Sequence, residues 1–121
     1  MDTTQSHLRF VDAHQLDTSA GRLDNVVVIA PTQTPLGKLA GVVVDPMNRQ
    51  LRYYVIRVRR WLSTRHYLMP LRSARLTADA HAMQVDFDAE ELKTFEQVDP
   101  DKVPAFSEED LLTAMFRPHA A

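Results

Sequence analysis

The 121-residue chain contains no cysteine, only 3 glycines and a single tryptophan. Without a thiol it can form no disulfide, no thiolate nucleophile and no cysteine-ligated zinc site. Glycine is too sparse for a phosphate-binding loop: Gly37 and Gly41 flank Lys38, but this segment continues as a strand. These shortages exclude several catalytic and metal-dependent classes of protein.

Long apolar stretches are missing as well. The longest runs cover residues 26–30 and 39–44, far short of the roughly 20 residues needed to cross a bilayer. Residues 1–7 are polar and lack the basic start and apolar core of a secretory signal. We therefore expect a cytoplasmic protein without a membrane span.

The apolar content is nevertheless sufficient for one core. Hydrophobic residues make up 45% of the chain, and a chain of this length fits one domain with tails. We expect an N-terminal segment over residues 1–22 and a folded domain over residues 23–97. A proline-containing linker and a C-terminal helix should then occupy residues 98–121.

Charge is distributed unevenly behind a formal net charge of -2. Residues 1–45 contain five acidic and three basic residues. Residues 46–75 contain eight arginines and no acidic residue, whereas residues 76–121 contain eleven acidic residues against three basic ones. An arginine-rich middle therefore precedes an acidic end.

Strand signals recur along the chain, at residues 26–29, 37–45, 50–59, 65–71 and 83–87. The last is the clearest, because Met83, Val85 and Phe87 alternate with polar residues at a period of two. Residues 37–45 are apolar on both faces, so neither face can be fully solvated. Short strands joined by tight turns predict a mainly β fold, closed or half-closed as a small barrel.

Local signals refine the ends of these segments. Pro46 and Asn48 carry the turn chemistry of a hairpin between the second and third strands. Near the start, residues 8–11 could form a short edge strand, while residues 12–16 read equally well as one helical turn.

Two helices are expected towards the end. Asp88 can cap a short helix over residues 89–94, and Ser107 with Asp110 repeats the capping signal before a helix that ends ahead of Pro118. An apolar stripe follows this second cap: Leu111, Leu112, Met115 and Phe116. The stripe could dock on the chain's own barrel, which we favour, or join two copies as a homodimer.

The residue pattern resembles a known family. GKLAGVVVDP at residues 37–46 and LRYYVIRV at residues 51–58 resemble the central hairpin of PRC-barrel domains. The pattern continues in the family's order with LMPL at residues 68–71, ARL at 74–76, MQVDF at 83–87 and EEL at 90–92. The resemblance covers about residues 24–95 and implies a small PRC-type β-barrel with a short helix after its last strand.

The chain departs from the family at several positions. Asn48 and Arg49 occupy a turn where glycine is usual, Gly41 replaces a frequent acidic residue, and Leu71 replaces a frequent tryptophan. The glycines common before the fourth strand are absent around Trp61. These departures indicate a divergent branch that keeps the barrel pattern.

Family members suggest how such a domain works. The barrel forms the cytoplasmic part of the photosynthetic reaction-centre H subunit, and it occurs in the ribosome-maturation factor that contacts a ribosomal protein. The resemblance therefore implies a protein-binding adaptor, without naming the partner.

Residues that could carry catalysis do not form a known constellation. The 5 histidines are scattered and lack ligand spacing such as His-x-x-x-His. Ser63 and His66 are close in sequence but have no evident third member of a triad. Strand alternation and helix capping explain the acidic cluster without a cation: Asp86, Asp88, Glu90 and Glu91. We expect no catalytic residue, no metal and no cofactor, and hence no enzyme.

The arginine-rich middle contains the candidate contact surface. Alternation places Arg57 and Arg59 on one face of a strand, and Arg60 with Arg65 brackets a loop that carries Trp61. An aromatic ring among guanidinium groups suits a protein hot spot and RNA alike. We therefore predict an adaptor or assembly module that binds a protein partner here, with RNA or ribosome association as the alternative.

These arginines could instead be neutralised within the chain. The charges of residues 46–75 and 76–121 nearly cancel, and exposed ion pairs are individually weak but would be numerous. This interpretation is slightly favoured by the sequence, because full neutralisation would leave little charge to attract phosphate.

Overall fold

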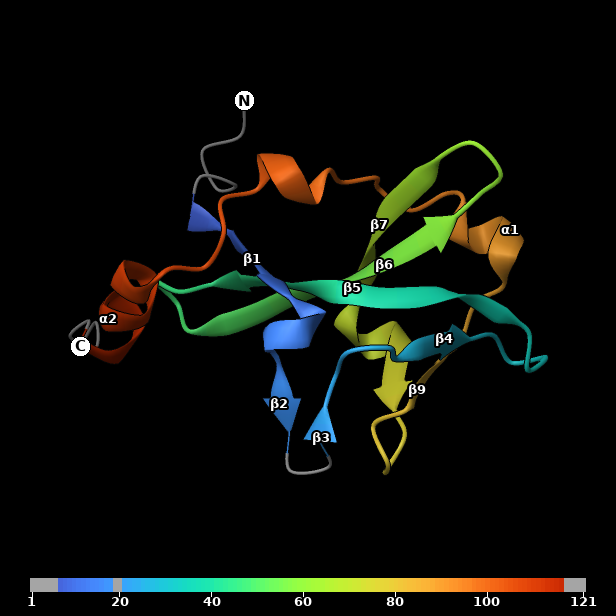
Figure 1. The fold of residues 1–121 in the computed structure, drawn as a ribbon, viewed down its shortest axis with the longest axis horizontal. Coiled ribbons are helices and arrows are strands. Elements are labelled where there is room, and N and C mark those ends of the chain that lie inside the picture. Colours follow the sequence, from blue (N-terminus) through green and yellow to red (C-terminus); the bar gives the residue numbers. More distant parts are fainter. Residues whose placement is uncertain (1–6, 19–20, 117–121) are drawn as a thin grey trace.

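The computed structural model describes residues 7–18 and 21–116. This part of the chain forms a mixed sheet of 7 strands in the order β7-β6-β5-β4-β9-β8, with β1 also paired to β5 (Figure 1). Its strands are β1 Arg9–Asp12, β4 Val27–Ile29, β5 Pro35–Asp45, β6 Gln50–Arg59, β7 Thr64–Pro70, β8 Ala74–Leu76 and β9 Ala82–Val85. A separate pair joins β2 (Asp17–Thr18) to β3 (Gly21–Arg22). The prediction of a mainly β protein is confirmed.

The centre of the sheet is the hairpin of β5 and β6. Asp45 shapes its turn, because the carboxylate accepts hydrogen bonds from the backbone N of Asn48 at 3.2 Å and from its Nδ2 at 2.7 Å. Arg49 follows with a φ of 53°, the left-handed conformation that glycine adopts most easily. The hairpin predicted from Pro46 and Asn48 is confirmed.

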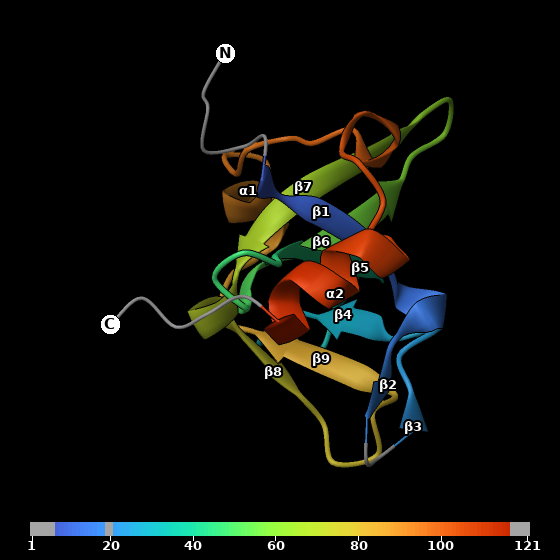
Figure 2. The ribbon, with the colours of Figure 1, turned by 90° about the vertical axis from the view of Figure 1, so that its left-hand side faces the viewer.

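The sheet is open. Its end strands, β7 and β8, are not hydrogen-bonded to each other, and β4 joins β9 in parallel. Figure 2 shows β6 and β7 above β5, with β4, β9 and β8 below. The pairing therefore shows a curved path of strands but not the closure of a barrel.

Apolar residues pack on both faces of the sheet, as the run over residues 37–45 predicts. The larger cluster includes Leu39, Ile56 and Phe87, while a smaller one on the other face includes Val43 and Val55. Neighbouring residues of one strand enter different clusters because side chains alternate across a strand. The alternating positions predicted for the core are buried: Met83, Val85 and Phe87.

Both predicted helices form at their capping residues. In α1 (Ala89–Leu92), Asp88 accepts a hydrogen bond from the backbone N of Glu91 at 2.9 Å. In α2 (Glu108–Phe116), Ser107 Oγ accepts from Asp110 N at 3.2 Å, and Asp110 Oδ2 accepts from Ser107 N at 2.9 Å. These reciprocal bonds form a capping box. No helix within residues 7–18 and 21–116 is long and apolar enough to span a membrane.

The segment between the two helices lies along strand edges. The backbone of residues 96–98 exchanges hydrogen bonds of 2.8 and 3.0 Å with Leu68 and His66 on β7. The backbone of residues 104–106 exchanges bonds of 2.9 and 3.0 Å with Phe10 on β1. The stretch predicted as a linker therefore satisfies backbone groups that an uncovered edge would leave unpaired.

Several short elements carry too little pattern to be predicted from the sequence. Strand β8 was not predicted, because three residues are too few to carry a period. The alternatives near the start both occur in succession, as β1 and then the 3₁₀ turn η2 (Ala13–Gln15). The strand predicted over residues 65–71 ends at Pro70, and the 3₁₀ turn η3 (Leu71–Ser73) follows; η4 (Pro100–Lys102) lies in the linker.

The apolar stripe of α2 does not pack on the sheet as favoured from the sequence. Its described side chains are roughly half exposed: Leu111 46%, Leu112 49% and Met115 60%. The side chain of Phe116 lies outside the described part of the chain. Arg9 Nε pairs with Asp110 Oδ2 at 3.1 Å, which holds the Asp110 side of the helix near β1 while the stripe stays about half exposed.

Candidate partner-binding surface

The candidate surface lies at the tip of the β6–β7 hairpin. Arg59 pairs with Thr64 at the end of the ladder, and Arg60 N donates to Ser63 O at 2.7 Å to close the turn. The two central turn residues are therefore Trp61 and Leu62. Figure 1 shows this turn projecting beyond the rest of the sheet.

Trp61 and Leu62 make almost no contact with the rest of the molecule. Their exposed fractions are 94% and 89%, the largest among the exposed large apolar residues of the described chain. Trp61 was expected to project, but Leu62 was not singled out. The exposure of Leu62 could have been predicted from its position: it lies next to Trp61 in a turn flanked by arginines, outside any strand that contributes to the core.

The structure divides the predicted arginines between two faces. Arg57 faces His66 across the ladder, so Arg57 and Arg59 share one face, as alternation predicts. Arg65 faces Val58, which packs against the larger core cluster, and it therefore lies on the other face. Guanidinium groups consequently surround the tip and do not form one flat patch.

The arginines at the tip form no ion pair with the described part of the chain. All of them are exposed, and none forms an ion pair with residues 7–18 or 21–116: Arg57, Arg59, Arg60 and Arg65. The pairing with the acidic end that the sequence slightly favours is therefore absent among these residues. Only Arg57 has a carboxylate in electrostatic reach among the described residues, since its charge helps to lower the pKa of Asp12; the arginines at the turn itself keep their charge available for a partner.

His66 adds little to that charge at neutral pH. Burial lowers the pKa of its imidazole below the usual 6.5, and the neighbouring charge of Arg57 lowers it further. Asp99 and Asp101 act in the opposite direction without cancelling the effect. The arginines therefore supply the positive potential of this surface.

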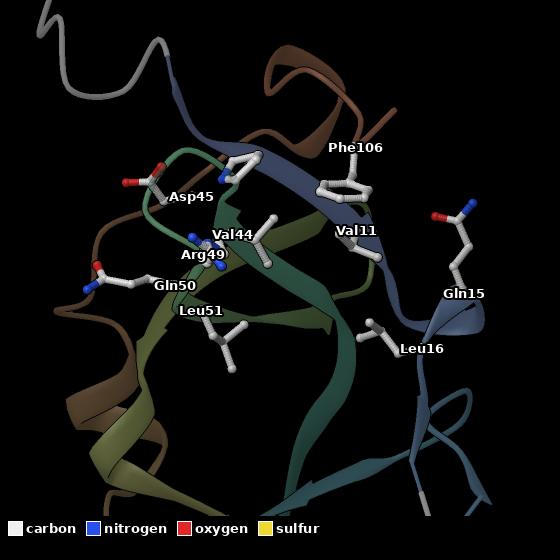
Figure 3. A pocket seen from close by; sticks show the side chains of 10 residues that line it. Val11, Gln15, Leu16, Val44, Asp45, Arg49, Gln50, Leu51 and Phe106 are labelled. Atoms are coloured by element: carbon white, nitrogen blue, oxygen red, sulfur yellow. The ribbon is translucent and has the colours of Figure 1, made fainter. Parts of the chain in front are cut away.

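A hollow lies at the opposite end of β6. It measures about 510 Å³ and opens between β1, η2 and the β5–β6 turn (Figure 3). Its apolar lining comes from distant parts of the chain: Val11, Leu16, Val44, Pro46, Leu51 and Phe106. Its polar lining residues are Gln15, Asp45, Arg49 and Gln50. This hollow could not be predicted from the sequence, since its walls meet only in the folded chain.

Hydrogen bonds hold the carboxylate at the edge of the hollow in its charged form. Burial of Asp45 opposes ionisation, but hydrogen bonds from Asn48 outweigh it and hold the pKa of this carboxyl below 3.8. Asp45 therefore stabilises the turn that forms one wall. Among the described residues, no group of three or more histidine and acidic side chains is placed to hold a metal ion.

Comparison with known proteins does not assign this chain to a family. Neither family models nor curated proteins match this chain. The resemblance to PRC-barrel domains remains a prediction from the residues.

Proposed function

We propose that this chain is a non-catalytic adaptor that binds a protein partner through the tip of the β6–β7 hairpin. The single observation that supports this most is the exposure of Trp61 and Leu62, at 94% and 89%. Binding hot spots are enriched in tryptophan and arginine, and they gain energy when an exposed anchor enters a partner's pocket. The tip supplies both residue types.

The arrangement of the tip also favours this function. The backbone of the turn is fixed by the bond from Arg60 N to Ser63 O at 2.7 Å. A preordered turn loses less conformational freedom on binding than a flexible loop would. The arginines around it can select a partner of opposite charge and speed the encounter.

A PRC-type barrel is the architecture we propose for this adaptor. The segments that resemble the family's central hairpin form β5 and β6, and α1 follows the last strand, β9. Approach of β7 to β8 would be needed to close the barrel. This finer assignment rests on the residue pattern and the order of elements.

RNA association is the second candidate, and it is favoured because the tip arginines form no ion pair with residues 7–18 or 21–116. Guanidinium groups bind phosphate, and an exposed indole can stack on an unpaired base. RNA binding would weaken steeply with salt because phosphate contacts release counterions. Burial of Trp61 and Leu62 by a protein would depend on salt less.

Affinity capture from cell lysate, with and without ribonuclease, tests the proposal. We expect Trp61→Ala combined with Leu62→Ala to remove specific protein partners, and Arg59→Glu with Arg60→Glu to do the same. Leu111→Ala with Arg75→Glu is the matched control, because it changes the same residue types at exposed positions on other elements. Retention of every partner by the tip variants would contradict the proposal, and loss of all partners after ribonuclease would favour RNA.

A further inference from the structure

The hollow at the far end of β6 is a preformed apolar recess. One of its walls is fixed by pairing of β1 with β5, which places Val11 opposite Val42. Another is Phe106, whose backbone N donates to Phe10 O at 3.0 Å. In Figure 3, Phe106 lies beside Val11, while Leu16 and Leu51 stand on opposite sides of the opening. Leu51 is 41% exposed there, so apolar surface remains uncovered.

The size and lining of the recess suit a large apolar side chain. A volume of about 510 Å³ lies within the range of roughly 300–1,000 Å³ typical of ligand pockets. Aromatic side chains contribute the largest buried areas at interfaces. The chain itself presents a tryptophan and a leucine at a projecting tip, and both are almost fully exposed in the described part of the chain.

Charges at the two ends are complementary. Glu108 and Glu109 begin α2 two and three residues after Phe106, which lines the recess. Both are exposed and form no ion pair within residues 7–18 and 21–116. Arg49 is the basic residue among those that line the recess. The segment that follows the recess residue Phe106 is therefore acidic, whereas arginines surround the tip.

The two features cannot meet within one molecule. Leu51 lies near the start of β6 and Arg59 at its end, and 10 residues of strand separate the two ends by roughly 30 Å. Figure 1 shows the hairpin tip and α2 at opposite ends of the molecule. A projection at one end and a recess at the other are suited to head-to-tail contact between copies.

We propose that the partner of the tip is a second copy of this chain, which receives Trp61 and Leu62 in the recess beside Leu51 and Phe106. This inference rests on the proposed function of the tip and adds the identity of its partner. Such a contact joins different surfaces of the two copies, so it builds a ring or a filament, or a two-fold dimer where the two copies exchange tips reciprocally. The acidic start of α2 in one copy faces Arg59 and Arg60 of the next.

The first test is sedimentation velocity. Protein concentrations should run from about 1 µM to 1 mM, the range of dissociation constants expected for a small interface. Because the chain has a single tryptophan, its fluorescence reports burial of Trp61 directly. We expect larger species and a blue-shifted emission as concentration rises. A monomer with unshifted emission at every concentration would overturn the inference. Loss of lysate partners by the Trp61 variant would still support the proposed function.

Variants at the two ends provide the decisive test. Trp61→Ala with Leu62→Ser removes the projection, and Leu51→Arg obstructs the recess; each should weaken association at least about 20-fold. Mixed together, the two variants should form a 1:1 complex, because each retains the surface that the other has lost. Failure of the mixture to associate would overturn a head-to-tail contact.

A third variant distinguishes the competing arrangement. Leu111→Ser with Met115→Ser alters the exposed stripe of α2 without touching the tip or the lining of the recess. We expect it to associate as the unaltered chain does. Loss of association in this variant, with Leu51→Arg unaffected, would replace the head-to-tail contact by a homodimer through α2.

Discussion

The two ends of β6 differ in how their residues are used. Opposite the start of β6, Asp45 at the end of β5 is 5% exposed and accepts hydrogen bonds from the turn. At its end, Trp61 is 94% exposed and packs on nothing described. The first end contributes to folding, while the second presents large apolar side chains that folding does not require. Substitutions at the two ends should therefore separate stability from binding.

The largest effect should come from Gly41→Val, in the packed centre of the sheet where β5 lies between β1 and Val55 of β6. A Cβ at Gly41 would meet the backbone O of Val11 and lie 2.7 Å from the Phe10 ring. Strand β1 must then shift, at a cost of about 3 kcal/mol in the free energy of unfolding. Chemical denaturation measures this loss. Gly21→Ala is the control, because no atom lies within 4 Å of its added Cβ, and about 1 kcal/mol is expected there from backbone strain alone.

The next effect is expected from Asp45→Ala. This change removes both hydrogen bonds to Asn48 and leaves turn donors without their acceptor, a loss of about 1–3 kcal/mol. Asp86→Ala changes an exposed carboxylate and should stay within about 0.5 kcal/mol. Equal midpoints of urea unfolding for the two variants would show that the turn does not stabilise this end.

A smaller effect should appear in acid. Burial raises the pKa of Asp110, but hydrogen bonds from Ser107 and the charge of Arg9 outweigh it and hold the pKa below 3.8. A lowered pKa in the folded state means that this stabilisation is complete above 3.8 and is lost as pH falls through the folded value. Asp110→Asn should cost about 1 kcal/mol at neutral pH and flatten the acid dependence. Hydrogen exchange of the α2 amides measures both, and an unchanged acid profile would contradict the role of Asp110.

The smallest effect on stability belongs to the tip. Trp61→Ala should change the free energy of unfolding by no more than about 0.5 kcal/mol, because almost no contact is lost. The same variant should lose its partner in capture and sedimentation experiments. If the thermal midpoint of Trp61→Ala fell as far as that of Gly41→Val, the tip would be part of the folded core. The two ends of β6 would then not differ in their contribution to stability.

Local chemistry made much of the fold predictable. The turn at Pro46 and Asn48, the cap at Asp88 and the box of Ser107 with Asp110 each depend on residues within a few positions of one another. Period-two alternation likewise placed Met83, Val85 and Phe87 in the core. Two features of the candidate surface were predictable from the sequence: the loop around Trp61, and the shared face of Arg57 and Arg59.

Other features depended on contacts between distant residues. Arg9 and Asp110 are 101 positions apart, yet their pairing holds α2 near β1 while its stripe stays about half exposed. The edge of β1 is covered by residues 104–106, and the recess combines Val11, Leu51 and Phe106. A local sequence pattern carries no information about such long-range contacts.

The sequence by itself determined the class of elements, their turns and caps, and a charged aromatic loop, because these follow from neighbouring residues. Only the tertiary structure decided that the sheet is open, that Arg65 lies on the face opposite Arg57, and that a recess stands at the far end from Trp61. Strand register sets which faces and edges residues share, and register is fixed by pairing between remote segments.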